Sequence, residues 1–243
     1  MKHIIPIVSL LFLSLSTSLS SLAEPAPFRA VYKADYKGLP VSAVGIRELK
    51  ILENGEYVLS SSANSFLATV TEQSLFRIEE QELVPLEYQY KRSGVGKNKK
   101  IKLTFDWPEG KVSDEAEGWE IEITPGILDK LLYQFRMRED LEKAALNNEP
   151  WPSMTYQIAD GGRLKTYDFK VTGEEELETP VGNINTVKVI RVRKSEDRST
   201  SFWLAPDYEF MLIRLQQIEK KNRGFELHLE EAEFDGKQIN GSD

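Results

Sequence analysis

The sequence predicts a mainly β protein built on a single, strongly curved antiparallel sheet, an open barrel or spiral. One amphipathic helix is expected to cover the concave side. Three observations support this fold: most of the chain alternates between apolar and polar residues, strong turn signals separate the alternating runs, and one segment has helical spacing instead. Because clean alternation leaves one face of a sheet in water, we expect the strands to be antiparallel.

The first 23 residues have the features of a cleaved signal peptide. Lys2 gives a basic start, residues 4–15 form an apolar core too short to span a membrane, and small residues precede the expected cleavage after Ala23. We therefore predict a periplasmic protein with one β-rich domain over residues 24–243 and no transmembrane anchor after cleavage. The chain has no cysteine, so neither a lipoprotein acyl anchor nor a disulfide is expected.

Four runs show the alternation of half-buried strands most clearly, with aromatic and aliphatic residues on one face and charged residues on the other. These runs are FRAVYKADY (28–36), IKLTFDW (101–107), WEIEI (119–123) and FELHLE (225–230). Turn signals lie between such runs, the strongest at Asn54-Gly55, and others occur at 108–110, 160–162 and 235–236. The strands are expected to follow one another as a meander.

The segment TPGILDKLLYQFRMREDLEKAALNN (124–148) breaks this period. Thr124 is a candidate N-cap and Pro125 suits the first helical position. Apolar residues then recur at helical spacing, at Ile127, Leu128, Leu131, Leu132 and Phe135. We expect this helix to cover the open side of the curved sheet.

Charge and histidine content argue against several classes of function. Without Lys2 the chain keeps 30 basic and 39 acidic residues, a net charge of −9, which argues against nucleic acid and anionic lipid surfaces as partners. His228 would be the one histidine left after cleavage, and it alternates with glutamates on a wet face. No catalytic triad, metal site or cofactor is therefore expected, and we predict a non-enzyme.

Two charged stretches have ordinary structural interpretations. RSGVGKNKK (92–100) lacks the first glycine and the Ser or Thr of a phosphate loop, so we interpret it as a basic hairpin loop. The acidic run at 174–176 is expected in a polar, turn-like, solvated stretch. No carboxylate has the apolar sequence context that glycosidase chemistry requires.

Aromatic residues are the candidate ligand-binding population, because all four tryptophans lie in or beside predicted strands. They either fill the sheet core or line a cavity that accepts an apolar ligand, and the sequence leaves both open. The candidate ligand-binding residues are Phe105, Trp107, Trp119, Leu128, Leu132, Phe135 and Trp203.

The stretch RSTSFWLAPDYEFMLIRL (198–215) predicts a hairpin. Pro206 suits the second position of a β-turn, and the apolar run from Phe210 should be covered on both faces. Arg214 interrupts that run and needs water or a carboxylate partner. Phe202 and Trp203 point to opposite faces of their strand, so at most one of them can face a pocket.

Five segments together resemble the domain-of-unknown-function 3108 family of exported Gram-negative bacterial proteins. They are FRAVYKADYKGLPVSAVG, LTFDWPEGKV, GILDKLLYQFRMRED, DGGRLKTYDFKVTGEEELETPVGNINTVKVIRVR and TSFWLAPD. Where the family commonly has Pro-Val-Arg-Ile, this chain has Leu212-Ile213-Arg214-Leu215. The resemblance implies an architecture of the lipoprotein-carrier type, a bent antiparallel sheet whose concavity a helix plugs, and it implies no activity.

Three hypotheses for function follow. The first is a non-enzymatic envelope protein that binds a lipid or a lipoprotein acyl chain between the curved sheet and the helix. The second is a scaffold with a filled core that docks another envelope protein through a sheet edge or the basic loop at 92–100. An unrecognised hydrolase comes last. Ligand, partner and oligomeric state are not specified by the sequence.

Overall fold

The computed structural model describes residues 24–37, 42–195, 197–219 and 223–242. The predicted signal peptide, residues 1–23, lies outside these residues. In the described part of the chain, the helix α1 (Leu132–Leu146) accompanies a single sheet. The strands are β1 (Phe28–Lys37), β2 (Ser42–Ile51), β3 (Tyr57–Asn64), β4 (Ala68–Glu79), β5 (Glu82–Gly94), β6 (Lys99–Asp106), β7 (Lys111–Asp114), β8 (Trp119–Glu122), β9 (Ile127–Leu128), β10 (Ser153–Ala159), β11 (Leu164–Thr179), β12 (Gly182–Val192), β13 (Arg198–Ala205), β14 (Met211–Glu219), β15 (Arg223–Phe234) and β16 (Lys237–Gln238).

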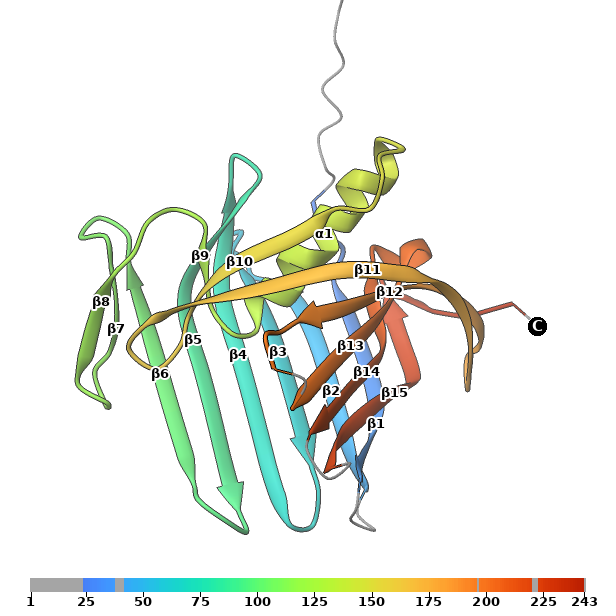
Figure 1. Ribbon diagram of the computed structural model, residues 1–243, viewed down its shortest axis with the longest axis horizontal. Helices are drawn as coiled ribbons and strands as arrows, with labels where there is room; N and C mark the ends of the chain where they lie inside the picture. The colour runs from blue at the N-terminus through green and yellow to red at the C-terminus, as the bar shows by residue number, and fades with distance from the viewer. Residues whose placement is uncertain (1–23, 38–41, 196, 220–222, 243) are drawn as a thin grey trace, which may run out of the picture.

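Two meanders joined edge to edge make up the sheet. Strands β1 to β8 follow one another as hairpins, and so do β10 to β15. The first and last long strands join them: β1 pairs antiparallel with β15 from Phe28↔Phe234 to Lys37↔Gly224. The sheet curves so that β10 to β15 cross in front of β2 to β6, with α1 at one end of the concave side (Figure 1). This confirms the predicted fold class.

The predicted start of the helix is wrong. Gly126 has φ +89°, a left-handed conformation that a helix cannot contain, and Ile127–Leu128 form β9, which pairs in parallel with β10. The helix begins only after Asp129, whose Oδ1 accepts the backbone N–H groups of Leu131 and Leu132 at 2.8 Å each. These donors have no partner within the helix, so Asp129 supplies the cap that the sequence pattern assigned to Thr124.

The polar run at 174–176 is also not a turn. It lies inside β11, the longest strand, where Glu174 to Glu176 pair with Val187 to Asn185 of β12. The segment keeps its polar character because all three glutamates are exposed. Glu175 binds Lys188 and Trp203 across the sheet, and such cross-strand contacts offset the low strand propensity of glutamate.

The hairpin at 198–215 has the predicted form, with a 3-10 turn in place of the β-turn. A 3-10 turn, η1 (Pro206–Tyr208), joins β13 to β14, and Met211 to Ile213 are buried as expected. Arg214 binds Glu226, with Nε 3.1 Å from Oε1, which identifies the carboxylate partner that its burial demands.

The space between α1 and the sheet is filled mainly by aromatic and aliphatic side chains. Phe135 of the helix lies 5.5 Å from Phe76 of β4, centroid to centroid, and Phe76 stacks on Tyr57 of β3 at 5.3 Å. Leu132 and Leu141 are fully buried on the same helix. Each such side chain stabilises the fold by about 1.5–3 kcal/mol relative to an exposed position.

Candidate functional site

The structure separates the seven predicted ligand-binding residues into four places. Leu128, Leu132 and Phe135 are buried at or near α1. Phe105 and Trp107 stack on each other at 6.1 Å on β6, and the indole N–H of Trp107 donates to the carbonyl of Pro85 at 2.7 Å. The remaining two, Trp119 and Trp203, lie on the terminal strand β8 and on β13.

Trp203 lies on the opposite face of β13 from the interior. Phe202 packs in the core, whereas the Trp203 ring is held between the Lys188 ammonium at 4.7 Å and the Arg214 guanidinium at 4.6 Å. Its indole N–H donates to the carboxylate of Glu175. Cation–π contacts therefore explain its burial, and of the two aromatic neighbours it is Phe202 that faces the concave side.

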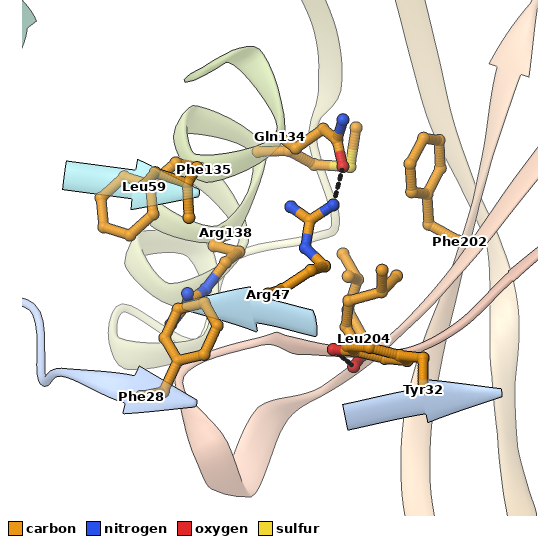
Figure 2. A pocket seen from close by; sticks show the side chains of 11 residues that line it. Phe28, Tyr32, Arg47, Leu59, Gln134, Phe135, Arg138, Phe202 and Leu204 are labelled. Carbon is orange, nitrogen blue, oxygen red and sulfur yellow. Dashed lines mark hydrogen bonds between the residues drawn. The ribbon is translucent and has the colours of Figure 1, made fainter. Parts of the chain in front are cut away.

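A cavity of about 20 Å³ lies beside α1 on the concave side, lined partly by Phe28, Tyr32, Phe135 and Phe202 (Figure 2). Arg47 points into it and donates to the Gln134 side-chain oxygen at 3.0 Å. Such a volume holds about one water molecule, whereas ligand pockets have volumes of about 300–1,000 Å³.

Buried polar side chains around α1 position the helix. The Asp129 carboxylate accepts the Ser74 hydroxyl at 2.5 Å in addition to the two helix N–H groups, and burial raises its pKa to about 6. Near the middle of α1, Arg138 donates from Nε to the Glu209 carbonyl at 2.8 Å and lies 4.9 Å from the Phe28 ring. Burial lowers the pKa of Arg138 to about 10. These contacts fix the helix in place.

The concave side is less completely filled away from α1. In Figure 1, α1 lies at one end of the sheet, and the β3–β4 and β5–β6 hairpins lie at the other. Inward-facing positions near these hairpins are only half-buried. Ala34 pairs with Ala43, so small side chains separate the apolar groups of β15 from those of β4 to β6. We call the half-buried apolar residues the open-end surface: Val70, Tyr90, Ile101, Phe225 and Leu227.

Two hairpin tips at this end carry exposed apolar side chains. Phe66 of the β3–β4 turn is 83% exposed, and Val95 of the β5–β6 turn is 66% exposed. The backbone N–H of Val95 donates to the Leu67 carbonyl at 2.8 Å, which joins the tips. The loop at 92–100 is thus the hairpin that the sequence predicted, and the Arg92 guanidinium shapes it by donating to the carbonyls of Val95 and Lys97.

Arg191 and Arg193 form a polar cluster on the concave side that the sequence did not single out. The Arg191 guanidinium lies 3.3 Å from the centroid of the Tyr167 ring, and Arg193 donates to the Thr200 hydroxyl at 3.3 Å. Tyr167 in turn contacts Tyr133 of α1 edge-on at 5.4 Å.

Metal-binding groups do not gather in the described part of the chain. No group of three or more His, Asp or Glu side chains there could hold a metal ion. His228 is half-exposed on β15, 3.9 Å from the Glu226 carboxylate, on a wet face as predicted. Nor is any helix among the described residues long and apolar enough to cross a membrane.

An open, curved antiparallel sheet plugged by one helix defines a β-barrel-like protein whose fold gives no sign of catalysis. The chain belongs to the family described as protein of unknown function (DUF3108), whose model matches residues 31–230, and this confirms the resemblance seen in the sequence. No curated protein matches it.

A solved structure supports the fold. A β-barrel-like protein of domain of unknown function DUF1849 from Brucella abortus is similar with a TM-score of 0.54 and 10% identity, covering 88% of this chain and 99% of that one. A candidate lipoprotein from Parabacteroides distasonis has a TM-score of 0.33 and 12% identity, over 85% and 95% of the two chains. At such identities the Brucella structure shows the fold alone.

Proposed function

We propose that this protein is a non-catalytic binding protein of the bacterial cell envelope. It accommodates the apolar part of an amphipathic ligand, such as an acyl chain, against the open-end surface. The observation that carries the proposal is that these five inward-facing apolar side chains are half-buried, while the next inward-facing residues towards α1 on β5, β6 and β15 are fully buried: Tyr88, Leu103 and Leu229. Covering such surface gains about 25 cal/mol for each Å² removed from water.

The location differs from the one expected from the sequence, between sheet and helix. There the cavity of about 20 Å³ leaves no room for an acyl chain in this conformation. The open end has inward-facing alanines beside apolar side chains, and a ligand can reach it without moving α1. Export is part of the proposal, and the features of residues 1–23 support it.

A fluorescent acyl probe tests this proposal. Dansylaminoundecanoic acid should bind the wild-type protein with increased, blue-shifted emission. The double variant Ile101→Gln and Leu227→Gln should weaken binding at least about ten-fold, because two apolar contacts are lost. The matched control Val44→Gln and Ile46→Gln changes apolar residues on the opposite face of β2 and should bind normally. Absence of wild-type binding, together with no co-purifying lipid in native mass spectrometry, would refute the proposal.

Docking of another envelope protein is the second candidate, and the joined hairpin tips favour it. Phe66 and Val95 are exposed apolar side chains beside the basic residues of the β5–β6 loop, a combination suited to an acidic partner with an apolar patch. Replacing Lys97, Lys99 and Lys100 with Glu should then remove a partner from a periplasmic pull-down, as should Phe66→Ser. A partner set that survives both changes rules this function out.

A further inference from the structure

The cluster formed by Arg191 and Arg193 faces the interior of the molecule. Val187 and Val189 of β12 are fully buried on the concave side, and Arg191 and Arg193 follow at the same two-residue spacing. Arg191 pairs with Phe169 of β11, another core residue. The two guanidinium groups thus continue the inward-facing row of β12 beyond the apolar core.

The aromatic and hydroxyl groups around the pair do not satisfy its donors. The Arg191 guanidinium lies over the Tyr167 ring, and Arg193 donates one hydrogen bond to another described residue, the Thr200 hydroxyl. The Nε atoms of both arginines are buried and have no hydrogen-bond partner. A guanidinium carries five N–H donors, so most of the hydrogen-bonding capacity of the pair is unused.

Counter-charge is missing as well. Among residues 24–37, 42–195, 197–219 and 223–242, no carboxylate lies within ion-pair distance of Arg191 or Arg193. Other buried or half-buried arginines have an acceptor for the guanidinium: Arg138 pairs with Glu209, Arg214 with Glu226, and Arg47 donates to the Gln134 side-chain oxygen. Burial, followed by the charges of Arg191 and Arg198, lowers the pKa of Arg193. Two neighbouring half-buried cations that have no carboxylate partner among the described residues are unfavourable unless a ligand supplies an anion.

We propose that Arg191, Arg193 and Thr200 bind an oxyanion, a carboxylate or phosphate group. A guanidinium group carries parallel N–H donors that match the oxygens of a carboxylate or phosphate, and such charge-assisted hydrogen bonds are strong. The Thr200 hydroxyl, which is buried on the same side, adds a further donor.

The position of the cluster identifies the oxyanion as the head of an amphipathic ligand, an assignment that rests on the proposed function. Thr200 pairs with Gln217, which pairs with Phe225 of the open-end surface. Ile190 pairs with Ser201, which places Arg191 beside Thr200 on that row. Three strand spacings of about 4.8 Å separate β12 from β15, about 14 Å in all, a distance that an extended acyl chain can span.

Paired probes test the site. Wild-type protein should bind dansylaminoundecanoic acid at least about ten-fold more tightly than its methyl ester, because the ester lacks the negative charge. Arg191→Gln with Arg193→Gln should abolish that preference and leave ester affinity unchanged. The matched control Arg29→Gln with Arg77→Gln removes the same charge from exposed arginines and should keep the preference. Equal binding of acid and ester by wild type would overturn the anion site while the proposed function stands.

Thermal unfolding with and without inorganic phosphate gives a second test of the oxyanion site. Phosphate should raise the Tm of wild type but not of the Arg191→Gln, Arg193→Gln variant, which tests the oxyanion site even if no acyl probe binds. Without ligand, the variant should be at least as stable as wild type, because it loses two half-buried positive charges that repel each other. A clear loss of Tm in the variant, or no response of wild type to either phosphate or the acid probe, would overturn the site.

Discussion

Asp129 shows how one residue sets the position of α1. Its carboxylate is fully buried and accepts three hydrogen bonds, from Ser74 and from the N–H groups of Leu131 and Leu132. Those contacts favour the ionised form, and burial opposes it more strongly, so the pKa rises from 3.8 to about 6. Asp129 therefore stabilises the fold through the hydrogen bonds that its oxygens accept. Its negative charge, by contrast, is unfavourable for the folded state at neutral pH.

Two substitutions of Asp129 should have opposite effects on the free energy of unfolding. Asp129→Ala leaves two helix N–H groups and the Ser74 hydroxyl without acceptors and should cost about 2–3 kcal/mol. Asp129→Asn keeps an acceptor oxygen without the charge. Because the folded pKa is raised, wild type loses stability as the pH rises from the unfolded to the folded value. From about pH 4 to about pH 7, the difference in the free energy of unfolding between Asp129→Asn and wild type should change by about 2 kcal/mol in favour of the variant.

Urea unfolding of wild type and both variants at the two pH values measures these effects. Comparing the variants with wild type cancels the titration of other buried acids, such as Glu139, whose pKa burial raises to about 8. If Asp129→Asn lost stability relative to wild type as the pH rose, the charge would be favourable and this account of the cap would be wrong.

At the scale of single elements, the sequence predicts strands better than their connections. The alternation of residues 28–36 and 101–107 corresponds to β1 and β6, because a half-buried strand needs that period. The start of α1 was missed because Ile127 and Leu128 fit the helical spacing although they form β9. Two sequence features mark the true start of the helix: Gly126, which readily adopts a left-handed conformation, and Asp129, a residue type that caps helices.

The candidate sites were harder to predict than the strands, for a physical reason. In β12 both faces carry apolar residues, Val187 and Val189 on one and Ile190 and Val192 on the other, so alternation does not assign Arg191 to a face. The structure assigns the face through the burial of Val187 and Val189 and through the pairing of Arg191 with Phe169. Trp203 was predicted to contact a ligand because it is aromatic. Its cation–π partners, Lys188 and Arg214, lie on other strands, so the local sequence does not show that they surround it.

On the scale of the whole molecule, the pairing of β1 with β15 ties the two meanders together. β1 lies between β2 of its own meander and β15 of the other meander, and it pairs with both. Inward-facing residues from both meanders also enter one core: Phe202 of β13 and Phe76 of β4 belong to the same buried cluster as Phe135 of α1. Neither half can therefore bury its concave face alone.

This connection predicts that residues 24–243 unfold as one cooperative unit. The four tryptophans are distributed over both meanders, so their fluorescence and the far-ultraviolet circular dichroism should give coincident urea transitions. Removing residues 223–243, which include β15 and β16, should expose the edge of β1 and unfold the entire chain, because the core loses one wall. A shorter deletion of residues 237–243 removes only the two-residue β16 and the last residues, and should retain the transition at a lower midpoint. Two separate transitions in the full chain, or a cooperative transition after loss of β15, would mean that the two meanders are independent domains.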